Sequence, residues 1–272
     1  PGKRSVTFDP DTGLISDQTY DVLPSSYVIE RYGQKPGLVA LTFDDGPDAR
    51  WTPKILDILK EKKAPATFFV IGENMQTRPD LVKREVAEGH EVGGHTWTHP
   101  NIGEIPIAQT DVELNATQRL FEVITGRSMR LFRPPFFGDA EPSTPHEVAP
   151  LVIAQELGYL IVGLRIDPDD WQKPTPQTII DRTLERLDHP GDRPGQVVLL
   201  HDAGGNRSRT VAALPGLIDA IRARGYRLVT IGELAGMTPD QAMPVSDRDP
   251  LALALDRVGF GLFRGLKFLL TT

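Results

Sequence analysis

The sequence predicts an α/β fold in which parallel strands alternate with crossover helices. From Leu38 onward, short apolar runs of strand length alternate about seven times with amphipathic stretches of helix length, which is the pattern of strand–helix–strand units. The 272 residues suffice for one large α/β domain or two small ones, and 39% hydrophobic residues is ordinary for a globular protein.

Seven apolar runs are predicted as strands: Leu38–Phe43, Thr67–Val70, Glu91–Gly93, Leu131–Arg133, Leu160–Leu164, Val197–Leu200 and Arg227–Thr230. Helical periodicity between several of them predicts helices at Pro53–Lys62, Pro79–Glu88, Gln109–Thr125, Thr178–Leu187 and Val211–Arg224. Pro53 and Pro79 stand in first turns, where a helix tolerates proline. Gly89 and Gly225 follow two of these helices directly and are typical of helix ends.

The two ends of the chain differ from this central part. Residues 1–36 are polar and turn-rich, so we expect an extension with at most a short hairpin. Residues 37–240 form the predicted main domain, and residues 241–272 form a C-terminal tail. Charges inside Leu251–Leu270 argue against a transmembrane span. Two interpretations of the tail stay open: a helix packed on its own domain, or an amphipathic helix on a membrane surface.

Charge and cysteine content exclude several kinds of partner and site. A net charge of -7, with a pI near 5.4, argues against nucleic acid as the main partner, because phosphate binding needs a clustered basic face. The absence of cysteine excludes disulfides and thiolate metal sites, so metal ligands must come from His, Asp or Glu. The chain begins at Pro1 without an initiating Met, and we expect it to be a processed or excised segment.

The first chemical motif is a pair of carboxylates at the end of the first predicted strand in the main domain. Asp44 and Asp45 follow the apolar run and precede Gly46-Pro47, which is a turn signal. Adjacent residues at a strand end point in different directions, so one acid can hold a metal while the other faces a water. A plain turn is the alternative interpretation of this segment taken alone.

The second motif is the pair of histidines His95 and His99, which follow the strand ending at Gly93. Two imidazoles four residues apart can face one point, and together with a carboxylate they form a common catalytic metal set with open positions. No Glu lies between them, which argues against the helical protease zinc motif. The general base must then come from elsewhere, and Asp44 or Asp45 can supply it.

Arg133 is the third candidate, at a strand end directly before Pro134-Pro135. Two prolines hold the chain extended, so the arginine is aimed rigidly, and a guanidinium near a carboxylate orients it and keeps it ionised. The alternative is an ordinary surface arginine before a loop.

Two further strand ends carry Asp170-Trp171 and His201. A carboxylate beside an imidazole raises the imidazole pKa and fixes its orientation, which suits a general acid. An exposed tryptophan can stack on a sugar ring, although core packing would explain Trp171 equally well. The remaining histidines have no such setting and are interpreted as solvated or structural: His90, His146 and His189.

Together, these segments resemble the five ordered motifs of the polysaccharide deacetylases with a NodB-homology domain, carbohydrate esterase family 4. The resemblance covers roughly Gly37–Leu234 and includes the strand Ala66–Val70. It implies that residues 37–240 are a catalytic domain folded as a distorted (β/α)7 barrel. It also implies a divalent metal, with zinc expected first and cobalt or nickel as alternatives.

The resemblance also assigns roles to individual residues. Asp45, His95 and His99 match the metal ligands, Asp44 matches the general base, and Arg133 matches the residue that orients this base.

On the acid side of the site, His201 resembles the general acid, tuned by Asp170. The backbone amide of Phe136 matches the oxyanion donor, where a tyrosine is usual in the family. Phenylalanine loses the tyrosine hydroxyl but keeps the amide. Three residues would line the substrate pocket: Trp171, Leu199 and Phe137.

The expected function is metal-dependent hydrolysis of N-acetyl groups from an N-acetylglucosamine-containing polysaccharide, with release of acetate. Chitin oligomers, peptidoglycan and poly-N-acetylglucosamine all stay open as substrates. Two alternatives keep the same fold: an esterase that removes acetyl esters, and a non-catalytic glycan-binding module. Because such polymers lie mostly outside the cytoplasm, we expect an extracytoplasmic domain. The tail is then expected to hold it near a membrane surface or to lead into a membrane glycosyltransferase portion.

Overall fold

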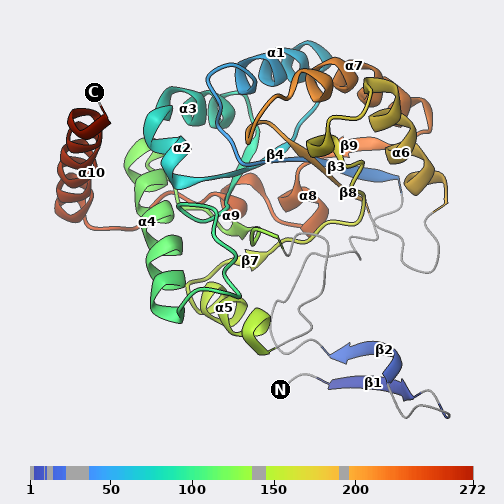
Figure 1. Ribbon diagram of the computed structural model, residues 1–272, viewed down its shortest axis with the longest axis horizontal. Coiled ribbons are helices and arrows are strands. Elements are labelled where there is room, and N and C mark those ends of the chain that lie inside the picture. The colour runs from blue at the N-terminus through green and yellow to red at the C-terminus, as the bar shows by residue number, and fades with distance from the viewer. Residues whose placement is uncertain are drawn as a thin grey trace.

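The computed structural model describes residues 3–8, 10, 15–22, 37–136, 145–189 and 196–271 (Figure 1). Within this range the chain forms a curled parallel sheet surrounded by helices, as the alternating sequence pattern predicts. Phe137, expected to line the substrate pocket, lies outside the described residues.

The sheet contains the seven predicted strands, all confirmed: β3 (Leu38–Asp44), β4 (Thr67–Val70), β5 (Glu91–Gly94), β6 (Leu131–Phe132), β7 (Leu160–Ile161), β8 (Val197–His201) and β9 (Arg227–Val229). Their order is β7-β6-β5-β4-β3-β8, with β9 also pairing with β3, and every pair is parallel. Ile166, just beyond β7, bridges to Val198 of β8. This bridge joins the two edges of the curled sheet, and the predicted distorted (β/α)7 barrel is confirmed.

Six longer helices follow strands of the barrel: α1 (Thr52–Lys62), α3 (Pro79–Ala87), α4 (Ile107–Thr125), α5 (Pro145–Glu156), α6 (Pro176–Asp188) and α7 (Ser208–Ala223). Five of these were predicted, and their ends differ from the prediction by no more than three residues. Short helical segments complete the connections: α2 (Gly72–Thr77), a 3-10 turn at Asp170–Gln172, α8 (Ile231–Ala235) and α9 (Pro239–Ala242). Gly89 and Gly225 have φ values of +85° and +81°, the left-handed conformation that ends a helix.

Alternation along β3 separates the core into two layers. Leu41 and Phe43 face the helices and join the main core with Ile55 of α1, whereas Ala40 belongs to a second cluster inside the barrel. Asp44 has the same parity as Ala40, so its side chain also points into the barrel. The strand pattern therefore decides that Asp44, and not Phe43, reaches the interior at this end of the sheet.

Both ends of the chain form regular elements. The N-terminal segment pairs β1 (Lys3–Phe8) with β2 (Ile15–Val22) in antiparallel fashion, which agrees with the expected short hairpin. The tail contains α10 (Pro250–Thr271), which packs on α4 and α2. Packing on the main domain continues past the predicted boundary at 240, because Met243 belongs to the main core. No helix in the described part of the chain is long and apolar enough to cross a membrane.

Candidate active site

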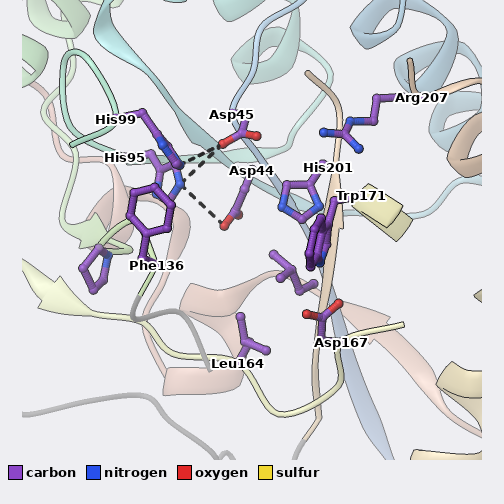
Figure 2. A pocket seen from close by; sticks show the side chains of 12 residues that line it. Asp44, Asp45, His95, His99, Phe136, Leu164, Asp167, Trp171, His201 and Arg207 are labelled. Atoms are coloured by element: carbon purple, nitrogen blue, oxygen red, sulfur yellow. Dashed lines mark ion pairs between the residues drawn. The ribbon is translucent and has the colours of Figure 1, made fainter. Parts of the chain in front are cut away.

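The predicted site residues meet at the carboxyl-terminal edge of the sheet. Asp44 ends β3 and pairs in register with His201, which ends β8. His95 and Arg133 follow directly after β5 and β6. Asp44, His95 and His201 line a cavity of about 410 Å³ (Figure 2). In parallel sheets this edge is where ligands bind, because loops and side chains from several strands converge there.

Asp45, His95 and His99 form a three-sided cluster whose ligand atoms all lie within 4.8 Å of one another. His99 Nε2 lies 3.3 Å from Asp45 Oδ1, and His95 Nε2 lies 3.6 Å from the same oxygen (Figure 2). The His95 Nδ1–H donates to the carbonyl oxygen of Arg133 at 2.7 Å, since a carbonyl can only accept. This tautomer leaves the His95 Nε2 lone pair free toward the cluster, as a metal ligand requires.

The charge state of the cluster also fits a cation. Burial lowers the pKa of His95 to about 3, so its imidazole is neutral at physiological pH. A neutral imidazole is a ligand, whereas a protonated one is not. Two imidazoles and one carboxylate make a donor set that suits zinc and neighbouring transition metals.

The loop that carries both histidines is fixed from behind by Glu113 of α4. One carboxylate oxygen of Glu113 accepts from the backbone amides of Trp97 and Thr98 at 2.7 and 2.8 Å, and the other accepts from the Thr98 hydroxyl at 2.7 Å. The Trp97 ring lies against Gly72, where an added Cβ would come within 2.3 Å of the ring. Glu113 therefore positions the loop without touching the cavity.

Asp44 is bound to Arg133, which is fully buried inside the barrel. Arg133 Nη1 donates to Asp44 Oδ1 at 2.7 Å and to the Thr42 hydroxyl at 2.8 Å, and Nη2 donates to the Gly163 carbonyl at 2.9 Å. Burial raises the pKa of Asp44, while the Arg133 guanidinium acts in the opposite direction. Asp44 Oδ2 is turned toward the histidine cluster, 3.8 Å from His95 Nε2.

On the opposite side of the cavity, His201 is bound to Asp170. The His201 Nδ1–H donates to Asp170 Oδ1 at 2.7 Å, while Asp170 Oδ2 accepts from the His201 amide and from the Thr210 hydroxyl at 3.0 and 2.7 Å. Burial alone would lower the pKa of His201, but the hydrogen bond and charge of Asp170 overcome this and raise it to about 9. The imidazolium is therefore the main form at neutral pH.

The cavity walls include most of the predicted substrate contacts. Trp171 is half exposed at the rim, Leu199 is buried in the wall, and the Phe136 ring packs edge-on against His99 with 4.9 Å between ring centroids. Four residues that the sequence did not single out as site residues also line it: Pro134, Leu164, Asp167 and Arg207.

Arg207 and Glu113 are the main side chains at the site that sequence reasoning missed. Arg207 is buried and donates through Nη2 to the Gly204 carbonyl at 3.0 Å. The only signal for Arg207 in the sequence is the preceding pair Gly204-Gly205. In the structure both of these glycines have positive φ values. Glu113 gives no signal, because an acid in a helix looks like a surface residue. His90, by contrast, is structural as predicted, since its Nδ1 accepts from the Ala66 amide.

Comparison with known proteins gives consistent results. A family model described as polysaccharide deacetylase matches residues 31–159. A peptidoglycan-N-acetylglucosamine deacetylase of Bacillus cereus is 37% identical over 215 residues, which cover 78% of this chain and 94% of that protein. A chitooligosaccharide deacetylase of Sinorhizobium fredii is 37% identical over 216 residues, covering 73% and 92% respectively. The crystal structure of a peptidoglycan N-acetylglucosamine deacetylase superimposes with a TM-score of 0.65 at 32% identity, covering 79% of this chain and 91% of that one.

The family model covers the strand ends that carry Asp44, His95 and Arg133, and the two relatives cover about three quarters of this chain. The fold, the ordered motifs and the possible Asp–His–His metal site agree with what the sequence resemblance implies. The chain belongs to the polysaccharide deacetylase family, carbohydrate esterase family 4, whose enzymes are metal-dependent hydrolases.

Proposed function

We propose that this chain removes N-acetyl groups from N-acetylglucosamine units of a glycan polymer and releases acetate. The observation that carries the proposal is the meeting of three groups at one cavity: a metal-binding cluster, a carboxylate base and an imidazolium acid. A glycan-binding module would have no need for the Asp44–Arg133 and His201–Asp170 pairs, because burying paired charges costs desolvation energy and adds little stability.

We propose zinc as the metal, held by Asp45, His95 and His99, with cobalt or nickel as substitutes. The cluster offers two imidazoles and one carboxylate, which is a common catalytic zinc set. A bound divalent ion would polarise the amide carbonyl and make a water more acidic.

The proposed base is Asp44. Its Oδ1 is occupied by Arg133, which leaves Oδ2 to accept a proton from the attacking water. Burial strengthens this base by raising its pKa, and the guanidinium keeps it ionised before the reaction starts. Arg133 also fixes the direction of the carboxylate, because it is itself held by Thr42 and Gly163.

The proposed acid is His201. An amide nitrogen is a poor leaving group until it is protonated, so a proton donor is needed on its side of the carbonyl. With Nδ1 bound to Asp170, the Nε2–H of His201 is the proton available to the cavity. We assign the backbone amide of Phe136 to the developing oxyanion and the half-exposed Trp171 ring to stacking on the sugar.

The substrate class can be tested by acetate release from peptidoglycan, chitin oligomers and poly-N-acetylglucosamine, with the metal-loaded protein. We expect turnover of at least one of these polymers and loss of activity after chelation. Acetyl esters provide the comparison, because an alcohol leaves more easily than an amine. The His201→Ala variant should therefore lose amide hydrolysis far more than ester hydrolysis. Ester hydrolysis alone by the unaltered protein would replace this proposal with the esterase alternative.

We also propose that the chain works outside the cytoplasm, where polymers of this kind lie. This location includes the periplasm, the cell surface and the medium, so protease added to spheroplasts, together with the released fraction, should digest this domain while a cytoplasmic marker stays intact. Digestion only after the cytoplasmic membrane is broken would contradict the proposed location.

A further inference from the structure

The tryptophan between the two histidines of the metal cluster, Trp97, packs toward the helices that surround the barrel. We refer to residues 95–99 as the metal loop. The Trp97 ring is partly buried against the main core, and an added Cβ on Gly72 of α2 would come within 2.3 Å of it. The Gly72 amide donates to the Thr96 carbonyl at 3.0 Å, and the Glu73 amide donates to the next carbonyl of the loop at 3.1 Å. The metal loop therefore rests on the start of α2.

A second contact to the Trp97 ring comes from α10, near the far end of the chain. The Phe260 ring stacks on the Trp97 ring, with 5.8 Å between centroids and 17° between planes. Gln76 of α2 is buried, and its Nε2 donates to the Phe260 carbonyl at 3.3 Å. In Figure 1, α10 lies at the outer edge of the molecule, beside α4. Phe260 thus connects this outer helix both to the metal loop and to the helix on which the loop rests.

Ion pairs hold α10 at the position where Phe260 meets Trp97. Asp256, one helical turn before Phe260, is buried and lies between two arginines. Arg119 Nε of α4 donates to one carboxylate oxygen of Asp256 at 3.0 Å, and Arg248 Nη1 donates to the same oxygen at 2.5 Å. Residues four apart lie on the same side of a helix, so the ion pairs and the aromatic stack act on one face of α10.

The metal loop needs such support because its backbone is strained. Thr96 and His99 have φ values of 67° and 62°, which side chains other than glycine rarely adopt. Strain of this kind persists only where the surrounding structure enforces it. Trp97 lies between these two residues, so the contacts of its ring help to keep the His95 and His99 imidazoles directed at Asp45.

We propose that Phe260 is a positioning residue for the metal site, so that docking of α10 and binding of a metal ion stabilise each other. The inference rests on the proposed Asp–His–His metal site. Without the Phe260 ring, Trp97 loses its stacking partner and the metal loop can relax from its strained conformation. Such coupling is reciprocal: if the docked helix favours the bound metal, the bound metal favours the docked helix to the same extent. α10 lies beyond Leu234, where the resemblance to the family motifs ends, so this support comes from the C-terminal tail.

The first test is the zinc affinity of the full chain, measured by competition with a chromophoric chelator. Phe260→Ala should bind Zn²⁺ about three- to tenfold more weakly than the unaltered chain. Phe260→Tyr keeps the ring and should keep the affinity. The matched control is Phe263→Ala, which removes the same side chain from the same helix at a position that is 51% exposed, and it should bind Zn²⁺ like the unaltered chain. Thermal melting of the metal-free proteins verifies that each variant is folded.

The second test uses the unaltered chain, so it does not depend on the folding of a variant. Amide hydrogen exchange in α10 should slow when Zn²⁺ is bound. Unchanged exchange in α10 would overturn the inference, and so would equal zinc affinity in Phe260→Ala and Phe263→Ala. If the unaltered chain binds no Zn²⁺, the proposed metal site fails and this inference fails with it. If the unaltered chain binds Zn²⁺ and only the tests of Phe260 and α10 fail, the metal site stands and this inference alone is lost.

Discussion

Replacing Asp170 by Asn tests the proposed acid without removing it. The substitution keeps the size of the side chain and its contact with Thr210, but it removes the charge that raises the His201 pKa to about 9. Burial, which is the largest single influence, is then opposed only by the charges of Asp44 and Asp45, and the pKa should fall to the ordinary value of about 6.5 or below. At pH 8 the protonated fraction of His201 would drop from about 90% to about 3% or less, which is a loss of about 30-fold in active acid.

The assay is the pH dependence of acetate release, expressed as kcat/KM. A group with a raised pKa is protonated below that pKa, so the basic limb of the unaltered enzyme should lie near pH 9. In Asp170→Asn this limb should move below pH 7, and the loss of rate should be smaller at pH 5.5 than at pH 8. Asp169→Asn is the control. Asp169 directly precedes Asp170 in the chain, and its carboxylate pairs with Arg182 at 3.0 Å. A basic limb that stays in place in Asp170→Asn would refute the reasoning.

Three other substitutions test separate parts of the site. Asp45→Ala should abolish binding of a stoichiometric metal ion, measured by elemental analysis after dialysis, while the melting curve shows a folded protein. Asp44→Asn should lower kcat by about 10²–10⁴-fold with unchanged metal content; near-normal turnover would mean that another group is the base. Glu113→Gln should weaken metal affinity by about tenfold or more, because the loop carrying both histidines loses its anchor. Competition with a chelator measures this, and an unchanged affinity would leave Glu113 with a purely structural role.

The sequence predicts the strands of the barrel and most of the site because both depend on local signals. Apolar runs fix the strands, and polar residues directly after them must lie at one edge if the strands are parallel. This reasoning places Asp44, His95, Arg133 and His201 together before any distance is known. The resemblance to a family then adds their roles, which neither the spacing nor the composition provides.

Other features depend on partners that are remote in sequence. Glu113 lies 16 residues after Trp97 and holds its backbone, and nothing around Glu113 distinguishes it from a solvated acid. The same holds for α10, because the sequence leaves open whether its apolar side packs inward or faces out. The ion pairs of Asp256 with Arg119 and Arg248 turn the Asp256 side of the helix toward the domain, and one of these partners is 137 residues away.

The backbone conformation at the site is also a feature that the sequence does not predict. Asp45, Thr96, His99 and Phe136 have φ values of 76°, 67°, 62° and 63°, in the left-handed region that side chains other than glycine rarely adopt. None of them is a glycine, so the sequence carries no mark of this conformation. Such strain persists only when the surroundings enforce it. Here the surroundings are identifiable: Glu113 accepts from the backbone amides of Trp97 and Thr98, and the Asn74 side-chain Nδ2 donates to the Asp45 carbonyl oxygen at 2.7 Å. Two proposed metal ligands are thus held in directions that a relaxed chain would not give them, so weakening these anchors should loosen the metal cluster before it destabilises the barrel.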